Sequence, residues 1–218
     1  PWRSRLAAFG RRVQRLRQES LLHLERLFGE LIPPGLLSQA DEGPNSRERV
    51  FSVRRTFWGF LYQALNPSCA CREVVRQIQA LFCLHHHGSV DEGTSGYCQA
   101  RRRLPLDTLK RLRHAIADRA DKFLPERQQL WHGLRPKVID GSTLSLPDTP
   151  KNQRAYPQSR SQKPGCGFPL LKIVAIFSLS SGVLLDYAKG NKHRHELALL
   201  YKLLDHFKAR DLVIADRG

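Results

Sequence analysis

Apolar residues recur at helical spacing along the first 136 residues. In segment 11–28, apolar side chains occupy one helix face and arginines occupy the other. Polar and turn-rich stretches separate this segment from the following ones. The same pattern predicts further helices over 50–65, 70–84, 95–104 and 104–124. The first part of the chain is therefore predicted to be all-helical.

The pattern changes at about Lys137. A β-type run is followed by a long loop rich in Pro, Gly, Ser and Gln, an apolar hairpin, an amphipathic helix and a last strand. These elements are predicted at residues 137–146, 147–169, 170–190, 192–207 and 211–218. A helix that leads back to a strand after a hairpin favours a mixed sheet with at least one parallel pair. The predicted fold class is α+β.

Charge narrows the choice of partner. The 218 residues carry a formal net charge of +16, and residues 1–137 hold 24 Lys or Arg against 13 Asp or Glu. Such an excess favours a polyanion, with DNA or RNA first, over a basic surface that only faces solvent. The N-terminus is too charged for a signal peptide, and no apolar run approaches the roughly 18 residues that span a bilayer. Five cysteines fit reduced thiols in a cytoplasm.

Two carboxylates stand where apolar strands end. Asp140 follows Val138 and Ile139, and Asp216 follows the apolar run of 212–215. If the two strands are parallel neighbours, both carboxylates lie at one edge of the sheet, where open α/β sheets place ligands. Carboxylate oxygens suit Mg²⁺, and a pair of such ions supports phosphodiester chemistry. The alternative is that each aspartate, close to a glycine, only forms a turn.

Several segments together resemble the DDE transposases of the insertion sequence 4 family. VIDGSTLSLPDTPKN, an apolar hairpin, a helix with Glu196 and DLVIADRG follow one another in the family's order. In that family, the first aspartate stands in a DG(S/T) segment, which Asp140 matches, and the second in a D-R-G segment, which Asp216 matches. The family's Y-x-x-A-R-x-x-L-P segment is matched by Tyr97, Ala100, Arg101, Leu104 and Pro105.

The resemblance implies a fold and a reaction. It implies a helical N-terminal DNA-binding or accessory domain, residues 1–136, and the first part of an RNase H-like mixed α/β sheet, residues 137–218. Asp140 and Asp216 would bind Mg²⁺ or Mn²⁺. Water would cut a transposon end, and the 3′-OH would then attack target DNA. Double-stranded DNA is the expected partner, with a homodimer in the complex, no membrane, and a nucleoid-associated location in a bacterial cytoplasm.

The third acidic residue of the family has no match here. It is a glutamate on a helix far downstream, and Glu196 is not a substitute by motif. The sequence is therefore interpreted as a piece of a longer transposase, with a two-metal site expected only once that glutamate is present. Alone, it is expected to bind DNA without efficient cutting. Two alternatives remain: a catalytically dead DNA-binding or regulatory remnant, and an RNase H-like metal-dependent nuclease.

Clusters of basic residues are the candidates for DNA contacts. Contacts of this kind position a DNA backbone without reading its sequence, although arginine runs are often only exposed helix faces. A zinc site is disfavoured because Cys69 and Cys71 are too close together for a finger. His193 and His195 also lack metal-binding spacing. The DNA-contact candidates are Arg101, Arg102, Arg103, Lys189, Lys192 and Arg194.

Overall fold

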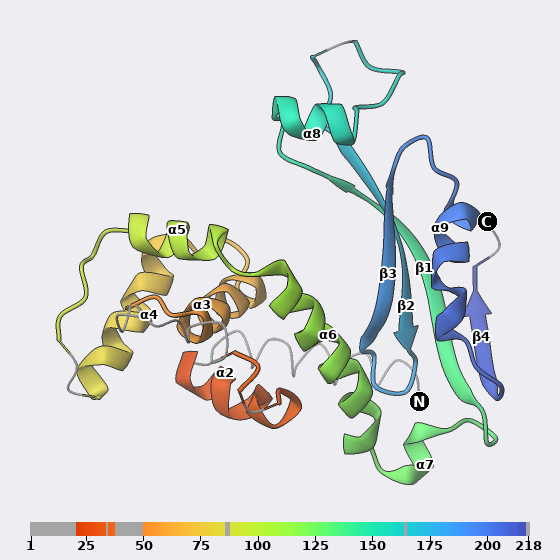
Figure 1. Cartoon of the computed structure of the whole chain (residues 1–218), viewed down its shortest axis with the longest axis horizontal. Helices are drawn as coiled ribbons and strands as arrows, with labels where there is room; N and C mark the ends of the chain where they lie inside the picture. The colour runs from red at the N-terminus through yellow and green to blue at the C-terminus, as the bar shows by residue number, and fades with distance from the viewer. Residues whose placement is uncertain (1–20, 34, 38–49, 86–87, 164, 217–218) are drawn as a thin grey trace. The chain divides into compact units, whose positions relative to one another are not determined.

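The structure is a computed structural model that describes residues 21–33, 35–37, 50–85, 88–163 and 165–216. The chain divides into two compact units, Pro1–Ala115 and Ile116–Gly218, which are drawn in Figure 1. Each unit is described by itself. The domain limits expected from the sequence, 1–136 and 137–218, stay a prediction. No helix among the described residues is long and apolar enough to cross a membrane.

The first unit is helical, as the periodicity predicts. The predicted helices that begin at residues 50, 70, 95 and 104 are all confirmed, and residues 11–20 of the first one lie outside the described residues. The serine at position 52 caps one helix by accepting a hydrogen bond from the backbone N–H of Arg55, at 3.3 Å. The helices are α2 (Leu21–Phe28), α3 (Val53–Leu65), α4 (Cys71–Leu84), α5 (Ser95–Arg102) and α6 (Leu106–Ala120), whose last turn belongs to the second unit, with the 3-10 turn η1 (Gly29–Leu31).

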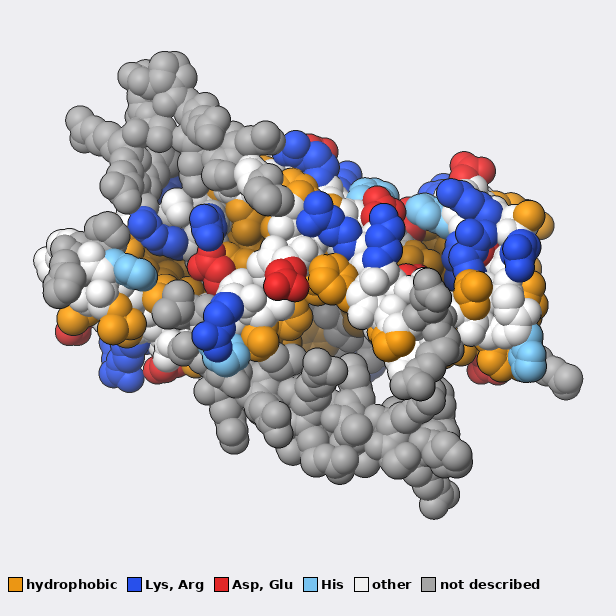
Figure 2. Space-filling model, turned by 90° about the horizontal axis from the view of Figure 1, so that it is seen from below, with side chains coloured by type: hydrophobic (Ala, Val, Ile, Leu, Met, Phe, Trp, Pro, Cys, Tyr) orange, Lys and Arg blue, Asp and Glu red, His pale blue; other side chains and the backbone are white. Residues whose placement is uncertain are grey.

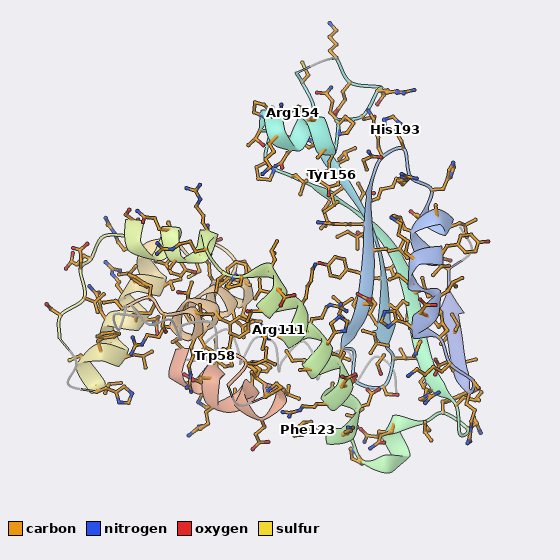
Figure 3. All side chains as sticks on the ribbon, viewed as in Figure 1. Trp58, Arg111, Phe123, Arg154, Tyr156 and His193 are labelled. Carbon is orange, nitrogen blue, oxygen red and sulfur yellow. The ribbon has the colours of Figure 1, made fainter. Side chains whose placement is uncertain are left out.

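Three helices meet at Gly59 of α3. A Cβ at this position would lie 2.7 Å from Val74 Cγ1 of α4 and 3.4 Å from Tyr97 Cε2 of α5. Glycine is therefore what lets the three helices approach so closely. The neighbouring Trp58, labelled in Figure 3, is 2% exposed, and Ile78 is fully buried. Trp58 of α3 is therefore part of the core.

The Y-x-x-A-R segment holds the helical unit together through Gln63 of α3. The Tyr97 hydroxyl donates to Gln63 Oε1 at 3.1 Å, and Arg101 Nη1 donates to the same oxygen at 2.8 Å. Tyr97 and Ala100 are buried. Gln63 Nε2 donates to the carbonyl of Cys69, just before α4, at 2.9 Å. One amide side chain therefore links α3, α5 and the turn before α4.

The second unit contains a four-stranded sheet in the order β3-β2-β1-β4. Its outer strand β4 runs parallel to β1, and the other neighbouring pairs are antiparallel. The expected mixed sheet with a parallel pair is confirmed, as is the α+β class. The RNase H-like assignment remains a proposal. The strands are β1 (Arg135–Ser145), β2 (Leu170–Ser178), β3 (Leu184–Asn191) and β4 (Asp211–Ala215).

One face of this sheet carries the core. The predicted helix of 192–207 folds as α9 (Glu196–Leu200) followed by the 3-10 helix η3 (Tyr201–His206), and both lie beside the strands in Figure 1. Leu199 and Leu203 pack on Val174 and Ile176 of β2, with Ile139 of β1 against this cluster. The short helical segments therefore cover the face on which Ile139 lies.

The prediction of a continuous loop over 147–169 is wrong for six residues. They form α8 (Pro150–Ala155), which the Thr149 hydroxyl caps by accepting from the backbone N–H of Asn152 at 3.2 Å. Proline at the first helical position needs no amide partner there, so it favours this start. The Pro-, Ser- and Gln-rich composition of this segment is typical of a loop, so composition gave no sign of this helix. The structure also adds α7 (Glu126–Gln129) and the 3-10 turn η2 (Asp121–Phe123) before β1.

Candidate functional site

The parallel pair of strands brings the two strand-end aspartates together. The register pairs Val138 with Ile214 and Ile139 with Ala215. Asp140 and Asp216 occupy the next position on each chain. Neighbouring strands are about 4.8 Å apart, and residues at paired positions share a face of the sheet. The expected juxtaposition of the two aspartates is therefore what the strand register produces.

Both aspartates line an open pocket with a volume of about 510 Å³. Its apolar part includes Val138, Phe177 and Ile214, and it extends to the turn between β2 and β3. Asp140 and Asp216 are exposed to solvent. Because Ile139 packs into the core, alternation along β1 places Asp140 on the other face of the sheet. The pocket thus lies on the face opposite to α9.

Glu196 lies close to this edge but lines a different surface. A Cβ on Gly141 would be 2.9 Å from Glu196 Oε2, so the glutamate stands over the backbone next to Asp140. Gly141 shares the α9 face with Ile139, whereas Asp140 faces the pocket. Glu196 is absent from the residues that line the pocket. Its position is consistent with the interpretation that it is not the family's third acidic residue.

A buried carboxylate fixes the strand that carries Asp216. Asp211 begins β4, and its side chain is 1% exposed. Its Oδ1 lies 2.8 Å from Arg135 Nε and its Oδ2 lies 2.7 Å from Lys137 Nζ. The backbone N–H of Lys208 also donates to Oδ2, at 2.8 Å. These contacts hold β4 beside β1 at the register that brings Asp216 next to Asp140.

The electrostatics of Asp211 follow from these contacts. Burial by itself would raise the pKa of this carboxyl, but the hydrogen bonds from Lys137, from the Lys208 backbone and from Arg135 outweigh it and lower the pKa. Sequence reasoning missed this residue. The only signal was an acidic residue at the start of one strand and basic residues at the start of another, and their pairing requires the register.

The residues present fit part of a site for a hard divalent cation. Two carboxylates at neighbouring strand positions can supply oxygen ligands, and Mg²⁺ keeps several waters when proteins bind it. Within the described ranges, no group of three or more His, Cys, Asp or Glu side chains could hold a metal ion. The cysteines at positions 69, 71, 83, 98 and 166 are free thiols. The pocket therefore offers two carboxylates of this chain.

The structure separates the DNA-contact candidates of the sheet unit. The pairing of Ser142 with Ile173, and of Ile173 with Lys189, places Lys189 on the same face as Asp140. Arg194 lies on the other face, because its Cβ is 3.0 Å from the position of a Cβ on Gly190. Lys192 donates to the carbonyl of Gln158 in the loop between β1 and β2. Lys189 therefore shares the face of the pocket, and Arg194 does not.

The arginine cluster of α5 divides in a similar way. Arg101 is partly buried, with its guanidinium on Gln63 and 5.9 Å from the centre of the Tyr97 ring. Arg102 and Arg103 are exposed. On the face drawn in Figure 2, Lys and Arg side chains lie at several separate places. A role of these residues in DNA binding stays a prediction, and the geometry favours Arg102 and Arg103 for it.

Comparison with known proteins finds similarity to transposases. Residues 131–218 match the family described as the transposase DDE domain. The chain is therefore related to the DDE transposases, and the resemblance to the insertion sequence 4 type is confirmed by its curated relatives. No solved structure matches the chain.

Two relatives come from Escherichia coli (strain K12). "Transposase InsG for insertion sequence element IS4" is 25% identical over 205 residues, which are 93% of this chain and 45% of the relative. "Putative transposase InsZ" is 28% identical over 128 residues, which are 56% of this chain and 41% of the relative. The chain thus spans less than half the length of these curated relatives.

Proposed function

We propose that this chain is part of a transposase that binds double-stranded DNA, at transposon ends and at the target. Asp140 and Asp216 would supply two carboxylates of a site for metal-dependent strand cleavage and strand transfer. The observation that carries the proposal is the in-register parallel pairing of β1 and β4, which ends at these two residues. A mixed sheet with carboxylates at the ends of neighbouring parallel strands also supports an RNase H-like fold for residues 137–218.

The chemistry follows from the ligands in the pocket. Bound Mg²⁺ or Mn²⁺ would activate the attacking water and stabilise the leaving oxygen of a phosphodiester. Asp140 and Asp216 would hold the ion, because two adjacent carboxylates repel each other until a cation lies between them. The pocket is open and both carboxylates are exposed, so water can complete the ligands of an ion bound there.

Basic side chains would position the DNA. Lys189 shares the face of the pocket, and Arg102 and Arg103 are exposed at the end of α5. Arg101, Lys192 and Arg194 are also proposed to contribute to DNA binding. Arg101 would do so indirectly, because its guanidinium holds α5 against Gln63. Such cations contact phosphates and set the path of the duplex without reading bases. A homodimer in the DNA complex and a nucleoid location in a bacterial cytoplasm complete the proposal.

A second candidate function is DNA binding without cleavage. It is favoured by the two carboxylates of the pocket, with no third acidic residue among its described lining residues. The 218 residues alone are therefore expected to bind DNA and not to cut it efficiently. A metal-dependent nuclease remains the third candidate. It differs from a transposase in that the cut 3′ end is not joined to new DNA.

Mn²⁺ binding tests the two carboxylates directly. Electron paramagnetic resonance of free Mn²⁺ would be measured against the parent chain, Asp140→Asn and Asp216→Asn. Each substitution removes one negative ligand, so Mn²⁺ affinity is expected to fall by about tenfold or more, equivalent to about 1.4 kcal/mol. Glu196→Gln, on the opposite face, is the matched control and should bind as the parent does. Equal affinity in parent and Asp140→Asn would exclude the proposed metal site.

Nicking of supercoiled plasmid separates the candidate functions. With Mg²⁺ present, the purified chain is expected to leave the plasmid intact while it binds it. Robust nicking that disappears in Asp140→Ala would overturn the expectation of an inactive chain. Joining of the cut 3′ ends to a second duplex would then distinguish the transposase from a nuclease.

A further inference from the structure

The hairpin of β1 and β2 continues well past the candidate metal site. β4 ends opposite Ile139, but the pairing of β1 with β2 runs on to Ser145 and Leu170. Ser145 lies five positions beyond Asp140, which is a distance of about 17 Å at about 3.4 Å per residue. Residues 146–169, which we name the β1–β2 arm, connect the strands there, and Figure 1 shows the arm with α8 beyond the sheet.

The β1–β2 arm carries cations that have no acidic partner among the described residues. Its single acidic residue is Asp148, whose Oδ1 accepts a hydrogen bond from Gln153 at 2.8 Å. Four basic side chains are exposed, and none of them forms an ion pair with a residue that the structure describes. These are Lys151, Arg154, Arg160 and Lys163. The arm therefore presents a net positive charge to solvent.

A single glutamine orders the tip of the arm. Gln158 Nε2 donates to the carbonyl of Lys163 at 2.7 Å, and its Oε1 accepts from the backbone N–H groups of Gly165 and Gly167 at 3.1 and 3.2 Å. Its own backbone N–H donates to Gln153 Oε1 at 3.1 Å. These hydrogen bonds fix the loop from both sides, so its cations are presented on an ordered backbone.

The turn after β3 adds further cations to the same end of the sheet. Lys192 Nζ donates to the carbonyl of Gln158, which joins this turn to the arm. Figure 3 labels Arg154 and Tyr156 on the arm and His193 on the turn. Arg194 is exposed on the turn as well. Lys192 thus joins the turn to the arm, and Asp148 is the only carboxylate in the sequence of segments 146–169 and 189–195.

The chemistry of the β1–β2 arm fits a phosphate backbone. Protein–protein interfaces are depleted of charged residues at their centre and contain aromatic anchors there. The β1–β2 arm has one strongly exposed aromatic side chain, Phe168, but charged residues are not depleted from it: it combines separate cations with Ser, Gln and Asn side chains, the residue types that contact DNA phosphates. Its position past Asp140 corresponds to about five base pairs at about 3.4 Å per base pair.

We propose that the β1–β2 arm binds the sugar–phosphate backbone of duplex DNA about five base pairs from the phosphodiester held at Asp140 and Asp216. The inference rests on the proposed function and adds a second contact point to it. The arm acts as a fixed phosphate clamp along the strand direction, and the pocket acts on the DNA at the other end of the same hairpin.

Charge removal on the β1–β2 arm tests the proposal. The quadruple variant K151Q/R154Q/R160Q/K163Q would be compared with R72Q/R76Q/K110Q/R111Q, which removes as many exposed cations from the helical unit. Binding to a labelled duplex of about 30 base pairs would be followed by fluorescence anisotropy at several KCl concentrations. The slope of log K against log salt should fall by about 2–4 in the arm variant, because each phosphate contact contributes about 0.9.

The affinity of the arm variant should fall by about tenfold or more at about 100 mM salt, and the control should change by less than about threefold. The double variant R154Q/R160Q should lose about half of the slope change. Gln158→Ala keeps every charge but removes the hydrogen bonds of the tip, so it should weaken binding by about twofold to fivefold and leave the salt slope unchanged. Circular dichroism would verify that each variant is folded.

The outcomes separate the two proposals. If the parent binds duplex DNA and the arm and control variants lose affinity equally, the arm is not a DNA contact, while the proposed function stands. If the parent does not bind duplex DNA at all, both the proposed function and the role of the arm are overturned. A selective loss in the arm variant supports both.

Discussion

The helical unit and the sheet unit bury their cores in different ways. In the helical unit, α3 is packed against α4 and α5 at Gly59, and the residues at this contact are almost fully buried. In the sheet unit, Val174 and Ile176 are buried under Leu199, but Ile214 of β4 is 41% exposed on the opposite face. One unit has a core around its central helix, and the other has a core on one face of its sheet.

Because the cores differ, polar contacts contribute differently to the two units. In the helical unit, apolar packing places the helices, and the hydrogen bonds of Gln63 add to it. In the sheet unit, β4 has less apolar packing, so the ion pairs of Asp211 with Arg135 and Lys137 contribute more to its register. Asp216 directly follows this strand. The geometry of the candidate active site therefore depends on the ion pairs of Asp211 at the other end of β4.

The largest effect is expected from Asp211→Ala. The substitution leaves Lys137, which is 14% exposed, without its carboxylate, and removes one strand-to-strand anchor. Loss of one partner from a buried ion pair costs about 3–5 kcal/mol, and the half-exposed Arg135 brings the expected loss to the lower end. Hydrogen exchange should rise in β1 and β4 and stay unchanged in α3 and α4.

The control for this experiment is Asp205→Ala, since Asp205 is an exposed aspartate of the same unit. Its effect should remain within about 0.5 kcal/mol. If Asp211→Ala were as mild as Asp205→Ala, apolar packing alone would place β4, and the contrast between the two units would disappear.

The second-largest effect is expected from Gly59→Val in the helical unit. Gly59→Val places a side chain where a Cβ already lies 2.7 Å from Val74 Cγ1. Overpacking of this kind costs about 1–3 kcal/mol. Gly29→Val is the matched control, because nothing lies within 4 Å of a Cβ there. Thermal unfolding with hydrogen exchange should show the loss in α3, α4 and α5, with the sheet protected as in the parent.

Sequence patterns predicted most helices and strands of the two units, but not the contacts that hold β4 in register. Periodicity located the helices of the first unit and the strands of the second, and it predicted the parallel pair through the order of the elements. It could not find the Asp211 cluster, because Arg135 and Asp211 are 76 positions apart and meet only through strand register. It missed α8 because a Pro-, Ser- and Gln-rich segment has the composition of a loop, although Thr149 and Pro150 begin a capped helix.

The candidate site was also predictable only in part. The two aspartates could be paired from strand ends and from the family resemblance. The positions of Lys189 and Arg194 on opposite faces could not, because a shift of one residue reverses the face of a strand residue. The inward position of Arg101 was also hidden, since an arginine run gives no sign of which member meets Gln63.

Acid should weaken the sheet unit before the helical unit. The pKa of Asp211 is lowered in the folded chain, so its contribution to stability is present above the pKa of the unfolded chain, about 3.9, and is lost as pH falls below that value toward the folded pKa. The loss should be smaller than that of Asp211→Ala, because a protonated carboxyl still accepts hydrogen bonds. Urea unfolding between about pH 3 and 6 would measure it, and Asp211→Asn should lack the dependence.

The smallest effect is expected from Tyr97→Phe. It removes the hydroxyl that donates to Gln63 Oε1, but Arg101 Nη1 still donates to that oxygen at 2.8 Å, so no buried acceptor loses all its partners. The expected cost is therefore about 1 kcal/mol in urea unfolding near neutral pH. Tyr201→Phe, at a side chain that is exposed, should cost less than about 0.5 kcal/mol.

The pH dependence of the Tyr97 contribution gives the experiment a second readout. Burial raises the pKa of Tyr97 to about 12, against the opposing effect of Arg101. A raised folded pKa means that the phenol stabilises the fold fully below about pH 10 and loses this contribution as pH rises toward 12. The Phe variant should lack this alkaline loss. A cost well above 1 kcal/mol would show that polar contacts, and not packing at Gly59, dominate in the helical unit, contrary to the comparison with the sheet unit.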